Sequence, residues 1–133
     1  MRTFGIVLAA ALAGGLAVSP AAADDLSGAW ATDGSACDKI FVKAGSRVTF
    51  RDNSELFGGG FVIDGNHVRG KATTCEIRSR RTAGAVTHML ANCASDIMLS
   101  SVQLSVRQPS PDTLVRIFPG MDGMELVYKR CPM

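Results

Sequence analysis

The amino-acid sequence predicts an all-β protein, a small antiparallel meander of about eight to ten short strands that closes into a barrel and carries two disulfides. Two observations predict the strands and their antiparallel order. After position 23 the apolar residues recur at every second position, without a helical stripe. Short segments rich in Gly, Pro, Asn and Asp separate these runs, so neighbouring strands are expected to be antiparallel. Closure would remove the sheet edges, and an open two-sheet sandwich is the alternative.

Ten strands follow from the alternation. They are expected at residues 27–32, 39–43, 47–51, 60–64, 67–72, 75–80, 85–93, 97–107, 113–118 and 124–131. Turn residues separate several of them, at 44–46, 64–66, 82–84, 109–112 and 119–123. The three glycines at 58–60 are expected to form a bulge, a corner or a loop tip, because no helix follows that would favour a phosphate site.

Residues 1–23 have the pattern of a cleaved signal peptide. Arg2 is followed by an apolar run over residues 4–18, and Ala21 and Ala23 are the small residues that signal peptidase requires. A run of about 15 residues is shorter than the roughly 20 that a membrane-spanning helix needs. Residues 24–133 are therefore expected to form one periplasmic or secreted domain that does not stay inserted in a membrane.

The charge balance argues against nucleic acid as a partner. The whole chain has 14 basic and 12 acidic residues. Removal of residues 1–23 takes away only Arg2 and leaves 13 basic against 12 acidic residues. A nucleic-acid-binding protein would show a basic excess concentrated on one face. The remaining 110 residues (133 minus 23) suffice for one domain.

Four cysteines lie in the expected domain, and an even number in an oxidising compartment favours two disulfides. Cys75 and Cys93 are placed on the two arms of the hairpin that turns at 82–84, within about one residue of register, so we expect them to pair. Cys37 and Cys131 then remain for the second bridge. Four cysteines allow three pairings, and the other two stay open at this point.

Enzymatic chemistry and bound metals are disfavoured by the residue inventory. There is no C-x-x-C for a thiol oxidoreductase or a zinc ribbon, and no G-x-S-x-G, H-E-x-x-H or paired-carboxylate pattern. His67 and His88 lie in expected strands, and a structural role is favoured for both. Met121 and Met124 lack a third soft ligand nearby and are interpreted as loop packing. No cofactor and no metal site is expected.

The segment Gly28-Ala29-Trp30, together with Arg130, resembles the G-x-W opening of the calycin barrels. That superfamily includes the lipocalins and the bacterial inhibitors of the alkaline-proteinase-inhibitor type. The resemblance implies that Trp30 closes one barrel end and that Arg130, from the last strand, lies across its indole. Side-chain parity agrees, because Arg130 shares a strand face with Leu126 and Tyr128.

The chain also departs from the inhibitor family that it resembles. Those inhibitors insert a free N-terminal segment into the protease, whereas only residues 24–27 precede Gly28 after the expected cleavage. Two disulfides are expected in place of one. The resemblance therefore bears more on fold than on inhibitory activity.

Three arginines are candidates for binding a partner. Arg78, Arg80 and Arg81, with Arg69 and Lys71 on the neighbouring strand, form a local concentration of positive charge that could receive an acidic partner.

We expect an exported, non-enzymatic binding module of the cell envelope whose partner is an envelope protein, with inhibition of a hydrolase as one candidate role. The alternatives are a carrier of a small ligand in the barrel mouth and a structural envelope protein. A deep apolar cavity would favour the carrier, and a filled barrel with an exposed loop end would favour the protein binder.

Overall fold

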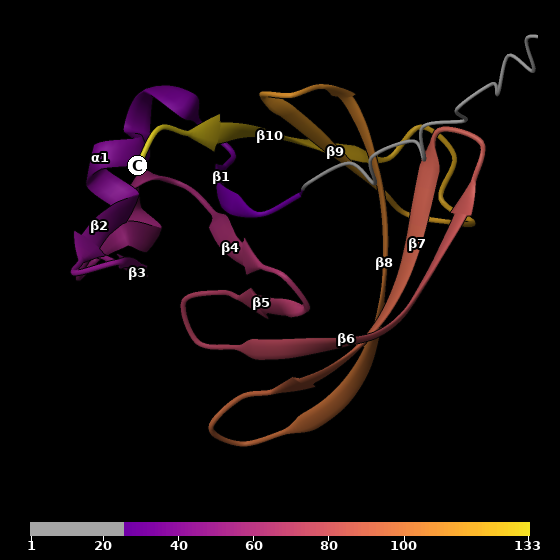
Figure 1. Cartoon of the computed structure of the whole chain (residues 1–133), viewed down its shortest axis with the longest axis horizontal. Helices are drawn as coiled ribbons and strands as arrows, with labels where there is room; N and C mark the ends of the chain where they lie inside the picture. The colour runs from indigo at the N-terminus through magenta and orange to yellow at the C-terminus, as the bar shows by residue number, and fades with distance from the viewer. Residues whose placement is uncertain (1–25) are drawn as a thin grey trace, which may run out of the picture.

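The computed structural model describes residues 26–133, and within them β-strands dominate (Figure 1). The strands are β1 (Gly28–Ala31), β2 (Phe41–Ala44), β3 (Arg47–Phe50), β4 (Gly60–Asp64), β5 (His67–Arg69), β6 (Thr74–Ala83), β7 (Val86–Ala94), β8 (Leu99–Ser110), β9 (Thr113–Ile117) and β10 (Glu125–Cys131). All ten expected strands are present, with β5 shorter than expected and β6 and β8 longer. The predicted signal peptide, residues 1–23, lies outside the described residues.

Eight of the strands form a closed antiparallel barrel in the order β1-β10-β9-β8-β7-β6-β5-β4. Strands β4 to β10 follow one another around the barrel in sequence order, as the meander prediction requires. The short strand β1 closes the ring, because it pairs on one side with β4 and on the other with β10. The closed barrel is confirmed, and the sandwich alternative is wrong.

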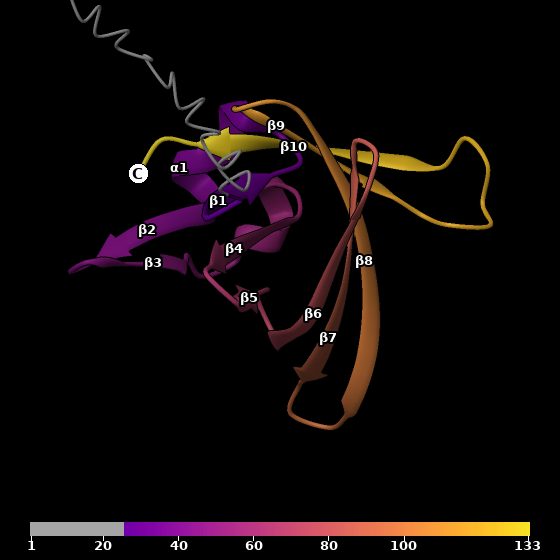
Figure 2. The same ribbon diagram turned by 45° about the vertical axis from the view of Figure 1, so that its right-hand side comes forward.

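Strands β2 and β3 are the exception to the predicted meander, because they form a separate two-stranded sheet. Figures 1 and 2 both show this hairpin beside α1 (Cys37–Ile40), apart from the long strands β6, β7 and β8. Ile40 and Phe41 are buried in a second apolar cluster with Val62, which lies on β4. The hairpin therefore covers the outside of the barrel, and the meander of about eight to ten strands expected from the sequence has eight strands in the barrel and two outside it.

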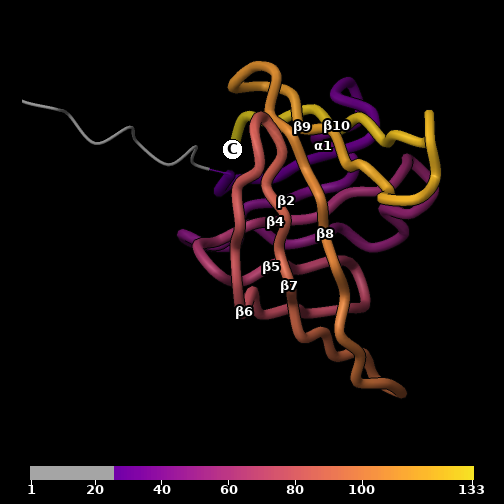
Figure 3. The backbone as a smooth tube through the Cα atoms, turned by 90° about the vertical axis from the view of Figure 1, so that its right-hand side faces the viewer, coloured from indigo at the N-terminus to yellow at the C-terminus, as the bar shows by residue number. Residues whose placement is uncertain are grey.

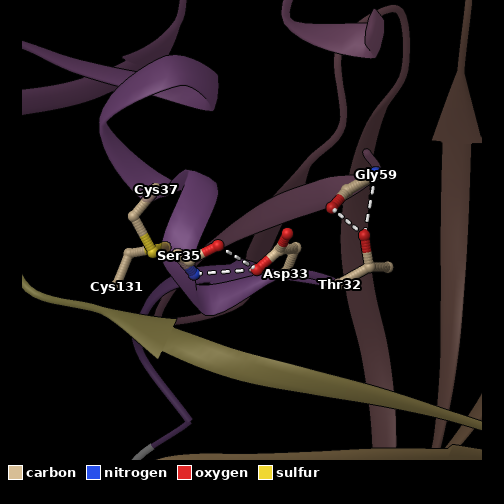
Figure 4. Close-up of a disulfide and its surroundings, with 6 residues drawn as sticks. All are labelled: Thr32, Asp33, Ser35, Cys37, Gly59 and Cys131. Carbon is tan, nitrogen blue, oxygen red and sulfur yellow. Dashed lines mark hydrogen bonds between the residues drawn. A yellow bond between two sulfur atoms is a disulfide. The ribbon is translucent and has the colours of Figure 1, made fainter. Parts of the chain in front are cut away.

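The short helix α1 and the 3₁₀ turn before it (Gly34–Ala36) were not expected from the sequence. The carboxylate of Asp33 caps this turn by accepting hydrogen bonds from the Ser35 amide (2.9 Å) and hydroxyl (2.7 Å), as Figure 4 shows. These two bonds, the hydroxyl bond first, lower the pKa of Asp33. The cap starts a single helical turn that places Cys37 against Cys131.

The glycines at 58–60 lead the chain from a second 3₁₀ turn (Ser54–Phe57) into β4. The Thr32 hydroxyl accepts a hydrogen bond from the Gly59 amide (3.1 Å) and donates one to the Gly59 carbonyl (3.2 Å). A Cβ at Gly60 would lie 2.7 Å from the Trp30 carbonyl oxygen and 2.9 Å from the Phe41 ring. Glycine is required there because the backbones of β1 and β4 approach closely while Phe41 packs over them.

Both expected disulfides are confirmed, Cys75–Cys93 and Cys37–Cys131. Cys75 lies directly opposite Cys93 on the β6–β7 hairpin, with a bulge between Ile77 and Ser79 shifting the register beyond them. The second bridge joins α1 to the last residue of β10, across 94 positions of sequence. One bridge is therefore local to a hairpin, and the other ties the outer layer to the closing strands.

The connections between strands gather at two ends of the barrel. In Figure 3 the β5–β6 and β9–β10 connections lie on the right and the β7–β8 connection lies at the lower right, whereas the β4–β5 turn and the start of β1 lie on the left. Because the strands are antiparallel, the β5–β6, β7–β8 and β9–β10 connections belong to the same end of the barrel, which is named the open end. Within residues 26–133 no helix has the length and apolar character needed to cross a membrane.

The two bridges should differ in their contribution to stability, because loop-closure entropy grows with the length of chain that a bridge spans. Changing both Cys37 and Cys131 to Ala should lower the free energy of unfolding by about 4–5 kcal/mol, and changing both Cys75 and Cys93 to Ala by about 3 kcal/mol. Urea denaturation monitored by circular dichroism measures both losses. A loss in the Cys75/Cys93 variant equal to or greater than that in the other would contradict the prediction.

Candidate ligand-binding cavity

One end of the barrel is closed by Trp30 and Arg130, which lie directly opposite each other on β1 and β10. The indole of Trp30 is fully buried (0% exposed), and the guanidinium carbon of Arg130 lies 4.3 Å from its ring centroid. The contact expected from parity and from the calycin resemblance is therefore present. A cation held over an indole face is attracted by the ring quadrupole while the ring covers its planar surface.

Hydrogen bonds fix both the indole and the guanidinium of this stack at the end where β1 begins. Trp30 Nε1 donates to the Leu26 carbonyl (2.9 Å). Arg130 donates from Nη1 to the Ser27 carbonyl and from Nε to the carbonyl of Pro111 (2.8 Å), in the β8–β9 turn. Each polar group carried into the barrel end thus finds a backbone acceptor, as buried donors require.

Gly28 is part of the same closure. A Cβ on Gly28 would lie 2.6 Å from Nη1 of Arg130, and its φ of +142° is a conformation that residues with a side chain rarely adopt. The Arg130 side chain therefore crosses the space that a side chain at position 28 would fill. This gives a physical reason for finding Gly28, Trp30 and Arg130 together.

Above this closure the barrel is hollow. A cavity of about 380 Å³ lies inside it, near the lower end of the roughly 300–1,000 Å³ typical of small-molecule sites. Its walls come from β4 to β9 and their connections and are mostly apolar. They are formed by Phe61, Ile63, Val68, Gly70, Thr73, Cys75, Met89, Cys93, Ser100, Val102, Leu104, Val106, Leu114 and Arg116.

The cavity has an apolar floor and reaches the open end. Phe61 packs edge-on against Tyr128, with ring centroids 4.7 Å apart, and both belong to the core cluster that contains Trp30. Gly70, Thr73 and Ser100, in contrast, lie in or beside the β5–β6 and β7–β8 connections. These connections therefore surround the entrance, which is why this end is called open.

One cation lines the mostly apolar wall. Arg116 is the fourth residue of β9 and shares its strand face with Leu114, which is fully buried. The guanidinium carbon of Arg116 lies 4.8 Å from the ring centroid of Phe118, in the β9–β10 connection. Arg116 was not among the site residues expected from the sequence, although the alternation that placed Arg130 inward applies equally to Leu114 and Arg116.

Large apolar side chains are exposed at the open end. Ile97 and Leu99, in the β7–β8 connection and at the start of β8, are 90% and 83% exposed, and Met98 between them is also exposed. Met121 and Met124 of the β9–β10 connection are exposed too, as is Leu126 near the start of β10. Leu126 was expected to face the interior with Tyr128, and it is instead open to solvent beside the entrance.

Arg78 and Arg80, two of the three candidate partner-binding arginines, contact different neighbours from Arg69 and Lys71. Arg78, at the bulge of β6, pairs with Glu76 (3.1 Å). Arg80 donates to the Gly65 carbonyl (2.7 Å) and to Asn66 Oδ1 (3.4 Å), and Arg81 is exposed. The structure therefore ties Arg78 and Arg80 to their own strand and to the β4–β5 turn.

Arg69 and Lys71 hold the outer layer instead. Arg69 donates to the Val48 carbonyl (2.6 Å) of β3, and Lys71 donates to the Arg51 carbonyl beyond that strand. Burial first, and the nearby charge of Arg47 second, lower the pKa of Arg69. These two cations therefore connect the barrel to the β2–β3 hairpin.

Neither histidine belongs to a recognisable catalytic arrangement. His88 Nδ1 lies 2.7 Å from the hydroxyl of Ser105, its direct neighbour on β8, and Ser105 is buried. His67 lies opposite Asp64 across the β4–β5 turn, and both line a groove with Arg69 and Arg47. Among residues 26–133 no group of three or more His, Cys, Asp or Glu side chains is placed to hold a metal ion.

No family model, curated protein or solved structure matches this chain.

Loss of the Arg130 stack should destabilise the barrel. Arg130→Ala should lower the free energy of unfolding by about 1–2 kcal/mol, because a partly buried cation–π contact and the packing of the arginine stem are lost together. For a domain of this size each kcal/mol corresponds to about 4–8 °C in melting temperature. Thermal unfolding measures the effect, with Arg81→Ala as the matched control on the exposed face. Equal melting temperatures for the two variants would contradict a stabilising role.

Proposed function

We propose that this protein is an exported, non-enzymatic binding module whose ligand is a small, largely apolar molecule held inside the barrel. The observation that carries the proposal is the apolar cavity of about 380 Å³. A well-packed interior leaves few voids larger than a water molecule, so a hollow of this size in a domain this small calls for an occupant.

The arrangement of the stabilising interactions supports this proposal. The Trp30–Arg130 stack and the Cys37–Cys131 bridge lie away from the cavity lining, whereas the Cys75–Cys93 bridge forms part of its wall. A covalently braced wall can remain in place when the cavity is empty, which reduces the cost of ordering the site on binding.

Export to an oxidising compartment is part of the proposal. All four cysteines of the chain lie within the described residues and all are paired. Disulfides of this kind persist in the periplasm or outside the cell and are rare in the cytosol. The signal-peptide pattern of residues 1–23 leads to the same compartment.

Inhibition of a hydrolase by an N-terminal arm is less well supported. Leu26 is buried, its carbonyl accepts the Trp30 indole N–H, and the Ser27 carbonyl accepts Arg130. The residues directly before β1 are thus held against the barrel end. An arm that enters a protease would therefore have to consist of residues that precede Leu26.

Filling the cavity should abolish ligand binding without unfolding the protein. Leu104 lines the cavity on β8, whereas Leu90, on the neighbouring strand β7, is exposed. Leu104→Trp should weaken binding of an uncharged apolar fluorophore, N-phenyl-1-naphthylamine, by at least about tenfold, because the indole takes the space of the ligand. Leu90→Trp is the matched control and should bind like the wild type. Fluorescence titration measures affinity, and circular dichroism checks the fold.

The outcomes of this experiment separate the alternatives. Absence of fluorophore binding to the wild-type protein would contradict the proposed function. Equal affinities for the Leu104→Trp and Leu90→Trp variants would place the binding outside the barrel.

A second candidate function is the binding of an envelope protein through the β7–β8 connection. The exposed side chains of Ile97, Met98 and Leu99 favour it, because consecutive exposed apolar residues on a loop are typical of an interaction site. A hydrolase remains one candidate partner.

The second candidate is tested by comparing capture from periplasmic extract. Changing Ile97 and Leu99 together to Ser should remove a partner that the wild type and the control Leu90→Ser both retain, because the loop loses its apolar contact surface. Identical sets of captured proteins for all three would contradict this role.

A further inference from the structure

One formally charged side chain lines the cavity, and it takes part in none of the ion pairs found within residues 26–133. Of the fourteen residues that line the cavity, Arg116 alone is charged. Its direct neighbours across the strands are Val106 on β8 and Leu126 on β10, and both are apolar. A cation beside an apolar cavity loses part of its hydration and gains most from an anion placed in that cavity.

Within residues 26–133 the Arg116 guanidinium makes neither an ion pair nor a hydrogen bond. The three ion pairs in this part of the chain involve Lys71, Arg78 and Arg107. Glu125, on the strand that pairs with β9, is held by Arg107 through both carboxylate oxygens (3.0 and 2.8 Å). The acid that the adjacent strand offers is therefore already engaged, and the contact of Arg116 with Phe118 leaves its N–H donors available.

The position of Arg116 matches the direction in which an elongated ligand would enter. Arg116 is one residue from the end of β9, next to the β9–β10 connection of the open end. Thr73 and Ser100, the two hydroxyl side chains of the lining, also lie at this end. Met89 and Leu114, which also line the cavity, are buried, and Phe61 packs on Tyr128 of the core. The cavity thus has polar groups at the entrance and an apolar interior.

We infer that the ligand is an amphipathic acid, with a short apolar chain inside the barrel and one carboxylate that pairs with Arg116 at the entrance. This inference rests on the proposed function and adds the chemical class of the ligand. The planar fork of an arginine matches a carboxylate through two parallel hydrogen bonds, which gives orientation as well as affinity. The modest cavity volume favours a chain of about ten carbon atoms over a long-chain lipid.

The test compares two ligands that share a chain and differ in the head group. Decanoate and decanol are titrated separately into the disulfide-bonded protein at pH 7, where a carboxylic acid is ionised, and binding is followed by calorimetry. Decanoate should bind about 10- to 100-fold more tightly than decanol, since a hydrogen bond to a charged group is stronger than a neutral one. Arg116→Leu should reduce this preference to about threefold or less and leave decanol binding unchanged.

Two further variants separate recognition from structure. Arg81→Leu removes the same charge from the exposed face of β6 and should retain the full preference for decanoate. Arg116→Lys should retain part of it, because it keeps the charge and loses the fork. A purely structural role for Arg116, stacking on Phe118, would instead lower the melting temperature of the Arg116→Leu variant and weaken both ligands equally.

Equal affinity of the wild-type protein for decanoate and decanol overturns the inference and leaves the proposed function standing. Equal weakening of both ligands by Arg116→Leu also overturns it. Failure of the wild-type protein to bind either ligand overturns both the inference and the proposed function.

Discussion

Stacking of Arg130 on Trp30 holds the strand on which barrel closure depends. Strand β1 has only four residues, yet it must pair with β4 and β10 at the same time. So few ladder hydrogen bonds leave the join dependent on side chains, and the buried indole with the cation across it supplies that contact. The bonds from Arg130 to the Ser27 and Pro111 carbonyls then connect the start of β1 to the β8–β9 turn. The closed end is thus firm without filling the middle of the barrel.

The buried apolar residues form two clusters with different roles in the fold. The inner cluster contains Trp30, Leu114 and Tyr128 and lies below and around the cavity. The outer cluster packs Ile40 and Phe41 against the barrel wall, where Cys37–Cys131 joins it to β10. Burial outside the wall contributes stability that does not require a filled interior. A domain of this size can therefore keep an internal hollow because part of its core has been placed on the outside.

Local patterns in the sequence predicted the features that depend on side-chain alternation and on the register of a hairpin. The strands, the Cys75–Cys93 bridge and the Trp30–Arg130 contact follow from parity and from hairpin register. The separate β2–β3 sheet was not predictable, since a strand shows the same alternation whichever strand it pairs with. Helix α1 spans one turn, too short to produce a periodic stripe, although Asp33 offered a capping signal. Side-chain parity could have placed Arg116 on the inner face of its strand. The cavity beside Arg116 depends on how the side chains pack, and alternation does not predict packing.

The closure of the barrel through β1 also orders the events of folding. A chain made from its N-terminus completes β1 first and β10 last, and Ala29 on β1 must finally pair with Cys131. Strand β4 can cover one edge of β1 early, while the other edge waits for the last strand. Until that strand arrives, the sheet has two unpaired edges able to pair with other chains, and its closure is a slow, non-local step. The strand made last therefore covers the open edge of the strand made first, and both edges of the sheet disappear in that one step.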